Sequence, residues 1–338
     1  AEMLRRSRKP VVLGVNKVDH IKYADSVYDF YELGIGAPVA LSAEQGLGIG
    51  DLLDEVVSYF EKNPEDEHPE VTNIAVVGKP NVGKSSLVNA LLGQERTIVS
   101  DIAGTTRDAI DTPFTYGGRD YMLVDTAGIR RKRAIEDESI ERYSVIRSLG
   151  AIRRADVVLI VIDAAEGLSE QDVRIAGYVH EEGKASVLIV NKWDLIEKDT
   201  HTMNEFKKKL SADLAFMDYV PMLFISALSG QRVGKVMEQA DFAYAQNCLR
   251  VSTGTLNDIV SEAVMVTEPP SDKGRRLKIY YATQVSVKPP TFVLFVNEPE
   301  LMHFSYKRYM ENYIRKSFGL TATPIRLLVR QRTKNAPL

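Results

Sequence analysis

The sequence is poor in the residues that build disulfides and membrane spans. Cys248 is the only cysteine among 338 residues, so no disulfide can form within the chain, and a reducing compartment fits this usage. No apolar run approaches the length needed to cross a bilayer, and no signal peptide is visible. These absences disfavour a secreted disulfide scaffold and a membrane protein, and predict a cytoplasmic one.

Charge is unevenly distributed along the chain. The whole chain has a formal net charge of −3, yet residues 273–338 contain thirteen Lys/Arg and three Asp/Glu, a net charge of +10. The preceding residues therefore carry a net charge of −13. A basic tail on an acidic body predicts either a polyanionic partner or a basic face that docks onto the body itself. The chain length predicts two or three domains.

A phosphate-binding loop stands out against this background. Residues Gly78 to Ser85 fit G-x-x-x-x-G-K-[ST], after an apolar run predicted as a strand and before a predicted helix. The glycines let the backbone curl so that N–H groups point at phosphate oxygens, and the helix N-terminus adds positive charge. Lys84 can reach the β- and γ-phosphates, and the Ser85 hydroxyl can ligate Mg²⁺. The predicted nucleotide contacts in the loop are Gly78, Asn81, Val82, Gly83, Lys84, Ser85 and Ser86.

Polar motifs after later strands indicate guanine. Asp194, in Asn191-Lys192-Trp193-Asp194, can accept both the N1–H and the N2 amino group of guanine, whereas adenine would leave the carboxylate desolvated and unpaired. We expect Asn191 to tie the loops together and the Lys192 stem to cover the base plane. Ser226-Ala227, after another predicted strand, would present a backbone N–H to guanine O6.

Two further motifs complete a metal-dependent phosphate site. Asp125, in Asp125-Thr-Ala-Gly128, would hold Mg²⁺ through water, and the Gly128 N–H would contact the γ-phosphate. Thr106, in the loop SDIAGTTRD, would ligate Mg²⁺ when the γ-phosphate is present. The predicted catalytic residues are therefore Lys84, Thr106, Asp125 and Gly128.

A strand–NKxD and strand–Ser-Ala pair occurs twice, in the same order. The first copy contains Asn16, Lys17 and Asp19, followed by Ser42-Ala43, and its phosphate loop would fall about a hundred residues before Ala1 if the copies match in length. We expect residues 1–62 to be the C-terminal part of a first GTPase domain, 63–72 a linker, 73–248 a complete second GTPase domain, and 249–338 a small α+β domain. Strand–helix alternation in the second copy predicts an α/β fold with a largely parallel sheet covered on both faces.

These residues resemble the Der (EngA) family of bacterial double GTPases. The doubling, the GxPNVGKSSLxN form of the loop, GTTRD, DTAGIRRK and the basic C-terminal region carry the resemblance. It implies P-loop GTPase domains followed by a KH-like domain, and hydrolysis of GTP to GDP and phosphate. It further implies a role in assembling the large ribosomal subunit, with ribosomal RNA contacted through the basic domain. We expect a monomer with no membrane association.

The sequence departs from related patterns at two places. Ile129 follows Gly128 where signalling GTPases place the glutamine that orients water, and the C-terminal domain lacks the G-x-x-G clamp of RNA-binding KH modules. Tyr306, Tyr309 and Tyr313 either stack on bases or fill the core. By resemblance, Asn81 is a K⁺ ligand that would offset charge between the β- and γ-phosphates; the alternative is that it stabilises the loop turn.

Two other interpretations remain open from sequence alone. The motif order from Asn16 also fits a circularly permuted GTPase, in which Asn16 and Asp19 would read the base for the loop at Gly78. The chain could instead be a non-catalytic scaffold that holds GTP structurally.

Overall fold

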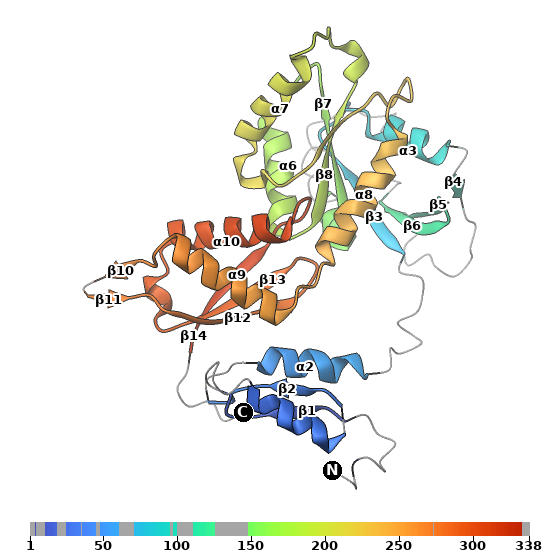
Figure 1. Cartoon of the computed structure of the whole chain (residues 1–338). Helices are drawn as coiled ribbons and strands as arrows, with labels where there is room; N and C mark the ends of the chain where they lie inside the picture. Colours follow the sequence, from blue (N-terminus) through green and yellow to red (C-terminus); the bar gives the residue numbers. More distant parts are fainter. Residues whose placement is uncertain are drawn as a thin grey trace.

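The computed structural model describes residues 4, 11–18, 25–34, 36–44, 48–60, 71–94, 97–99, 111–125, 148–272 and 274–332. Along the chain lie an N-terminal segment (residues 11–60), a central domain (71–247) and a tail domain (249–332), which Figure 1 shows in blue, cyan to light orange, and orange to red.

The central domain is built on a seven-stranded sheet with the order β4-β5-β6-β3-β7-β8-β9. Its strands are β3 (Thr72–Val77), β4 (Thr97–Val99), β5 (Thr112–Tyr116), β6 (Arg119–Val124), β7 (Val157–Asp163), β8 (Ala185–Asn191) and β9 (Met222–Phe224). Strands β6, β3, β7, β8 and β9 are parallel, while β4 and β5 run antiparallel at one edge. The expected largely parallel sheet is confirmed. Gly117 and Gly118 close the β5–β6 hairpin with φ of 58° and 82°, as a two-residue turn requires.

Helices cover both faces of this sheet (Figure 1). On one face α3 (Lys84–Leu92) and α8 (Gly234–Asn247) pack against one set of strand residues; on the other, α6 (Glu170–Glu181) and α7 (Thr202–Asp213) pack against the alternate set. Every residue of β7 and β8 is buried, which explains their continuous apolar sequences. A capping box between Ser169 and Asp172 starts α6. Short 3-10 helices cover Trp193–Leu195 and Ala215–Met217.

The tail domain is the predicted small α+β unit. A three-stranded sheet, β12 (Ile279–Ser286), β13 (Thr291–Val296) and β14 (Arg326–Gln331), packs against α9 (Thr253–Val266) and α10 (Phe304–Phe318). The sequence did not predict the small hairpin of β10 (Ser271–Asp272) and β11 (Arg275–Arg276) or the 3-10 turn Pro299–Leu301.

The tyrosines of α10 hold the two helices of the tail domain together. The hydroxyl of Tyr306 donates to Thr267 O at 3.0 Å and that of Tyr309 to Ala263 O at 2.8 Å. Tyr306 is buried, and its ring lies 5.5 Å from that of Tyr309. Of the two roles left open by the sequence, the structure supports core packing for this pair.

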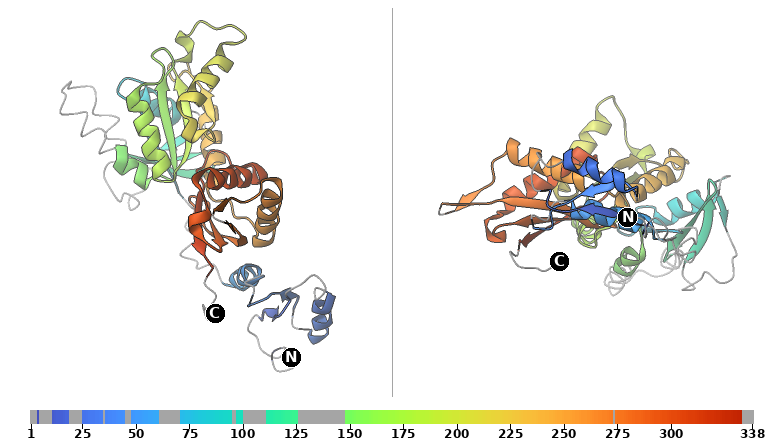
Figure 2. Two further views of the ribbon diagram at one scale, coloured as in Figure 1. Left: turned by 90° about the vertical axis from the view of Figure 1, so that its left-hand side faces the viewer. Right: turned by 60° about the horizontal axis from the view of Figure 1, so that its bottom comes forward.

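The N-terminal segment has its own two-stranded parallel sheet, β1 (Leu13–Val15) and β2 (Pro38–Ala40), separate from the seven-stranded one. A 3-10 helix (Asp25–Leu33) lies between the strands, and α2 (Ile49–Ser58) follows them. Helix α2 contacts α9, and Arg332 of the tail donates to Glu44 O at 2.8 Å. The segment therefore lies against the tail domain, as both views of Figure 2 show.

The tail domain docks on the amino ends of the central strands (Figure 1). Ser186, at the start of β8, donates its N–H to Ala322 O, and the Ala322 N–H donates to Tyr219 O, both at 2.8 Å. Arg315 of α10 places its guanidinium 4.4 Å from the Tyr219 ring centre and donates to Leu320 O and Thr323 O. The junction thus combines backbone pairing with a stacked cation.

Arg315→Ala should lower the free energy of unfolding by about 2–3 kcal/mol, because two carbonyls lose their donor and the Tyr219 ring loses its cation. Urea denaturation followed by circular dichroism measures this loss. Lys316→Ala, the exposed neighbour, should change stability by less than about 0.5 kcal/mol. Equal effects of the two variants would contradict the importance given to this junction.

Candidate nucleotide site

The carboxyl ends of the parallel strands bring the sequence motifs to one edge of the sheet. The phosphate loop follows β3, Asp125 follows β6, Asn191 ends β8, and Ser226 lies two residues beyond β9. Ligands of open α/β sheets bind at this edge. The strand order therefore brings motifs that are more than a hundred residues apart in the sequence to one place in the fold.

The phosphate loop needs glycine at both of its defining positions. A Cβ on Gly78 would lie 2.2 Å from Val161 O, and one on Gly83 would lie 2.2 Å from Asn191 Nδ2. Gly83 also has a φ of 94°, which favours glycine. The Lys84 ammonium donates hydrogen bonds to Gly78 O at 2.7 Å and to Lys79 O at 2.5 Å. It therefore lies over the loop that is predicted to bind the phosphates.

Asn191 joins the phosphate loop to the predicted base loop. Its side-chain Nδ2 donates to Val82 O at 2.8 Å, and its Oδ1 accepts the N–H of Ala227 at 2.9 Å. The side chain is buried, so losing either contact would leave a buried polar group unpaired. Asn191 thus ties the two loops together, as its motif suggested.

The neighbouring residues of the NKWD motif are arranged around a buried tryptophan. Trp193 packs edge-on against Phe206 and Phe224, with ring centres 5.1 and 4.6 Å away. Lys192 has a left-handed backbone with φ of 59°. Asp194 is exposed, so its carboxylate is accessible to a base. Anchoring by Trp193 was not predicted, because the third position of the motif carries no fixed residue type.

Two lysines of the site are held by carboxylates that the sequence did not single out. Lys79, inside the phosphate loop, lies 2.8 Å from Glu166 and 3.6 Å from the buried Asp172. The hydrogen bond with Glu166 raises the pKa of Lys79 above its ordinary value despite burial. The Lys192 ammonium lies 2.5 Å from Asp163, at the end of β7.

Asp163 is the charged partner that orients Lys192. Burial alone would raise the pKa of Asp163, but the Lys192 ammonium and the N–H groups of Ala165 and Glu166 together hold that pKa below its usual value. The carboxylate is therefore ionised at neutral pH and fixes the end of the Lys192 side chain. In the sequence, the one signal for Asp163 was its position at the end of an apolar strand, the kind of position at which the motifs also occur.

The backbone N–H groups of Ser226 and Ala227, predicted to face guanine O6, both have partners within the protein. Ser226 donates its N–H to Gln231 O, and Ala227 donates to Asn191 Oδ1. Leu228 follows them with 89% of its surface exposed. The predicted O6 contact through Ala227 therefore stays a prediction.

Oxygen ligands suited to Mg²⁺ come from the same edge of the sheet. Ser85 is the second residue of α3 and is exposed, and Asp125 follows Val124, which pairs with Ala75 on β3. Hydroxyl and carboxylate oxygens fit this hard cation. Thr106, Gly128 and Asp19 lie outside the described residues, so their predicted roles stay predictions.

The N-terminal segment repeats the local geometry of the NKWD site. Lys17 has a φ of 69°, like Lys192, and Asn16 Oδ1 accepts the N–H of Ala43 at 2.9 Å, like Asn191 and Ala227. Val18 N–H donates to Leu41 O at 3.0 Å, as Trp193 N–H does to Ile225 O.

This repeated segment does not serve the phosphate loop at Gly78. The motif asparagine bonded to that loop is Asn191, through Val82 O, whereas Asn16 follows β1, a strand of a separate sheet. The circularly permuted interpretation, in which Asn16 and Asp19 read the base for this loop, is therefore wrong.

Comparison with known proteins now decides the family. Residues 73–192 match the family described as 50S ribosome-binding GTPase, and residues 250–330 match the KH-domain-like C-terminal region of EngA bacterial GTPase enzymes. GTPase Der of Alkaliphilus oremlandii is 58% identical over 98% of this chain and 76% of its own length. The chain belongs to the GTPase Der family. It is a GTP hydrolase, and this family membership excludes the non-catalytic scaffold.

Further similar proteins include a second GTPase Der and a solved structure. GTPase Der of Desulfitobacterium hafniense is 60% identical over 98% of this chain and 75% of its own length. A crystal structure of Era with MgGDPNP and 16S ribosomal RNA aligns over 78% of this chain and 93% of its own, at 21% identity and a TM-score of 0.40. Within the described residues, no helix is both long and apolar enough to cross a membrane.

Asp194→Asn should lower GTP affinity by about a hundredfold and favour xanthosine triphosphate, because the amide can donate to the O2 that replaces the guanine amino group. Isothermal calorimetry with GTP, xanthosine triphosphate and ATP measures the change. Asp213→Asn, on the exposed end of α7, is the control and should bind like the parent. Equal affinity of the parent for ATP and GTP would overturn the assigned role of Asp194.

Proposed function

We propose that this Der-family chain is a GTP-dependent switch that acts in assembly of the large ribosomal subunit and contacts ribosomal RNA through its tail domain. The observation that carries the proposal is the net charge of +10 in residues 273–338, attached to a GTPase domain. The match of residues 73–192 to a family described as 50S ribosome-binding GTPase points to the large subunit. The protein would act as a monomer in the cytoplasm.

The contacts of the tail narrow the surface that RNA would meet. Several of its cations are already engaged within the protein; these are Arg275, Arg276, Lys288, Arg315, Arg326 and Arg332. Arg308 and Lys316, by contrast, are exposed and two helical turns apart on one face of α10. Phosphates spaced along a nucleic-acid backbone match such a stripe, and neutralising them releases counterions.

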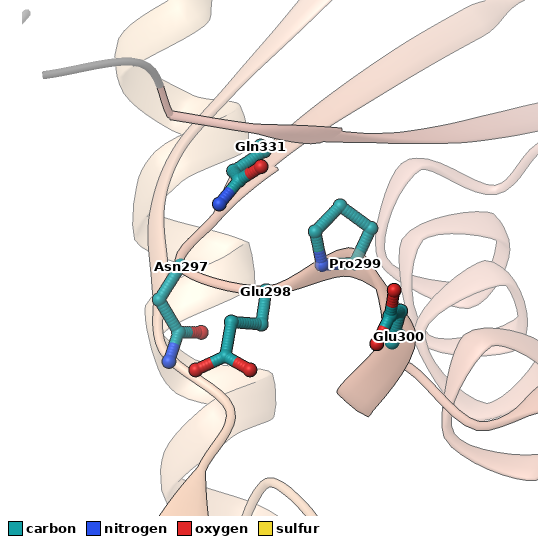
Figure 3. A pocket seen from close by; sticks show the side chains of 5 residues that line it. All are labelled: Asn297, Glu298, Pro299, Glu300 and Gln331. Carbon is teal, nitrogen blue, oxygen red and sulfur yellow. The ribbon is translucent and has the colours of Figure 1, made fainter.

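An open hollow on the tail domain is unsuited to RNA. It has a volume of about 410 Å³ and is lined by Asn297, Glu298, Pro299, Glu300 and Gln331, which Figure 3 shows around the turn after β13. Glu298 and Glu300 are two of the three acidic residues in the basic tail. Because carboxylates repel phosphates, RNA should bind along α10 rather than here.

The repeated geometry supports a second nucleotide-binding domain at the N-terminal end. Asn16, Lys17 and Ala43 reproduce the conformation of Asn191, Lys192 and Ala227. We assign residues 1–62 to the C-terminal part of a first GTPase domain, 63–72 to a linker, 73–248 to the second GTPase domain and 249–338 to the KH-like domain. Asn16, Lys17 and Asp19 would contact the base bound there.

In the second domain, different residues would bind the metal ions and the phosphates. Ser85 and Asp125 would hold Mg²⁺ with Thr106, and Mg²⁺ would offset charge on the phosphates. Lys84 would turn from its carbonyl contacts to the phosphates, and the Gly128 N–H would contact the γ-phosphate. Asn81 is exposed with φ of 64°, and no hydrogen bond of its side chain occurs among the described residues, so its amide oxygen is available to K⁺.

Hydrolysis should be about tenfold faster in K⁺ than in Na⁺ at equal ionic strength, a difference of ~1.4 kcal/mol in activation free energy. Asn81→Ala should remove the difference, whereas Asn89→Ala, exposed on α3, should keep it. Phosphate release under single-turnover conditions measures both. Identical parent rates in the two salts would reject the K⁺ site and leave the Mg²⁺ site intact.

The chain should co-sediment with large ribosomal subunits in the presence of a non-hydrolysable GTP analogue, and much less with GDP. Replacing Arg308 and Lys316 together by glutamate should weaken binding and lower the salt slope by about 2, because two phosphate contacts are lost.

The control for this charge reversal is the same pair of substitutions at Lys207 and Lys208, which are exposed on α7 of the GTPase domain. Subunit binding by this control should equal that of the parent. Binding that is the same with GDP and the GTP analogue would contradict the switch. Equal loss in the two double variants would contradict the α10 surface.

A further inference from the structure

Asp111, directly before β5, has a carboxylate that joins two distant parts of the chain. Only 5% of its side chain is exposed. One oxygen, Oδ1, accepts the backbone N–H of Asp125 at 2.9 Å, and the other, Oδ2, accepts the guanidinium of Arg154. These partners lie 14 and 43 residues further along the chain. Both oxygens of one buried group are therefore used for long-range contacts.

The Asp125 contact is made at a strained point of the backbone. Asp125 follows the last residue of β6 and has a φ of 57°, in the left-handed region. Such a conformation is unfavourable for a non-glycine residue and persists only where the surroundings enforce it. The hydrogen bond from its N–H to Asp111 is a contact that enforces it, and it sets where the Asp125 side chain leaves the sheet.

Arg154 is itself held in place, so it can serve as a fixed support for Asp111. Residues 148–154 are helical and end beside the start of β3. There Asp156 accepts both the backbone N–H of Asn73 at 2.9 Å and its side-chain Nδ2 at 3.1 Å, and donates its own N–H to Asn73 O at 2.8 Å. The guanidinium reaches from this anchored chain to the buried carboxylate.

We propose that Asp111 is a positioning residue of the magnesium site: it fixes the backbone of Asp125, and Arg154 fixes Asp111. This role rests on the proposed Mg²⁺ site at Ser85 and Asp125. A carboxylate that binds a metal through water is not held in place by direct coordination, so other contacts must orient it. Residues that hydrogen-bond to metal-binding groups therefore contribute strongly to metal affinity. Asp111 itself does not touch the ion or the phosphates.

The test measures how Mg²⁺ slows release of a fluorescent GDP analogue from the full chain. In the parent, release should slow as Mg²⁺ rises, and the midpoint of this titration reports metal affinity. Asp111→Ala should move the midpoint to about tenfold higher Mg²⁺, the value expected for losing one hydrogen bond behind a metal ligand. Thermal unfolding without Mg²⁺ records the general loss of stability in each variant.

A control is Asp241, which lies on α8 and contacts the same hairpin. Asp241 accepts the Tyr121 hydroxyl of β6 at 2.7 Å and lies 3.4 Å from Arg119, so Asp241→Ala also removes a carboxylate joined to β6, but one that does not contact Asp125. Its Mg²⁺ midpoint should stay at the parent value. Asp111→Asn combined with Arg154→Met keeps an Oδ1 acceptor for Asp125 without the ion pair, and should recover most of the shift.

The outcomes separate the two levels of the argument. If GDP release from the parent is indifferent to Mg²⁺, the proposed Mg²⁺ site is wrong and the positioning role falls with it. If the parent responds and Asp111→Ala has the parent's midpoint, Asp111 does not position the site, while the Mg²⁺ site stands. Equal shifts of the Mg²⁺ midpoint for Asp111→Ala and Asp241→Ala would also reject the positioning role of Asp111. Should Asp111→Ala fail to fold, Arg154→Met decides: it should also raise the Mg²⁺ midpoint, because it leaves the Asp111 carboxylate without its cation, and the parent's midpoint in this variant would reject the proposal.

Discussion

One buried amide determines whether this protein has a nucleotide site at all. The loop that receives phosphates follows β3, and the loops predicted to receive the base follow β8 and β9, with β7 between them. The side chain of Asn191 spans this separation by donating to Val82 and accepting from Ala227. It also explains the sequence of the phosphate loop, because Nδ2 lies so close to Gly83 that no side chain fits there. Asn191 therefore both joins the two loops and requires a glycine at position 83.

Much of this arrangement could be predicted from the sequence because its signals are local. The apolar strands β7 and β8, the capping of α6, the Gly117-Gly118 turn and the phosphate loop each depend on residues adjacent in the chain. The motifs after β3, β6 and β8 converge because parallel strands share one edge. The similarity between residues 16–43 and 191–227 was also visible, and the hydrogen bonds at both places have matching lengths.

What the sequence could not reveal depends on distant partners. Lys79 looks like an ordinary loop lysine until the fold places Glu166 and Asp172 beside it. Ser226 and Ala227 form a recognisable motif, yet whether their N–H groups are free depends on Gln231 and Asn191. The tyrosines of α10 could equally have faced RNA, and only the position of α9 determines that Tyr306 and Tyr309 donate inward. The net charge of the tail likewise suggested more cations free to bind RNA than the structure leaves, because several of them have partners within the protein.

The attachment of the tail to the amino ends of the central strands has a mechanical consequence. Force on the tail reaches the central domain through the covalent link from α8 and through the Ser186–Ala322 backbone pairing and the Arg315–Tyr219 stack. Among the described residues, this pairing and this stack lie at the end of the sheet opposite the phosphate and base loops. A load carried by the tail would thus act at the amino ends of the strands, while nucleotide would enter and leave at their carboxyl ends.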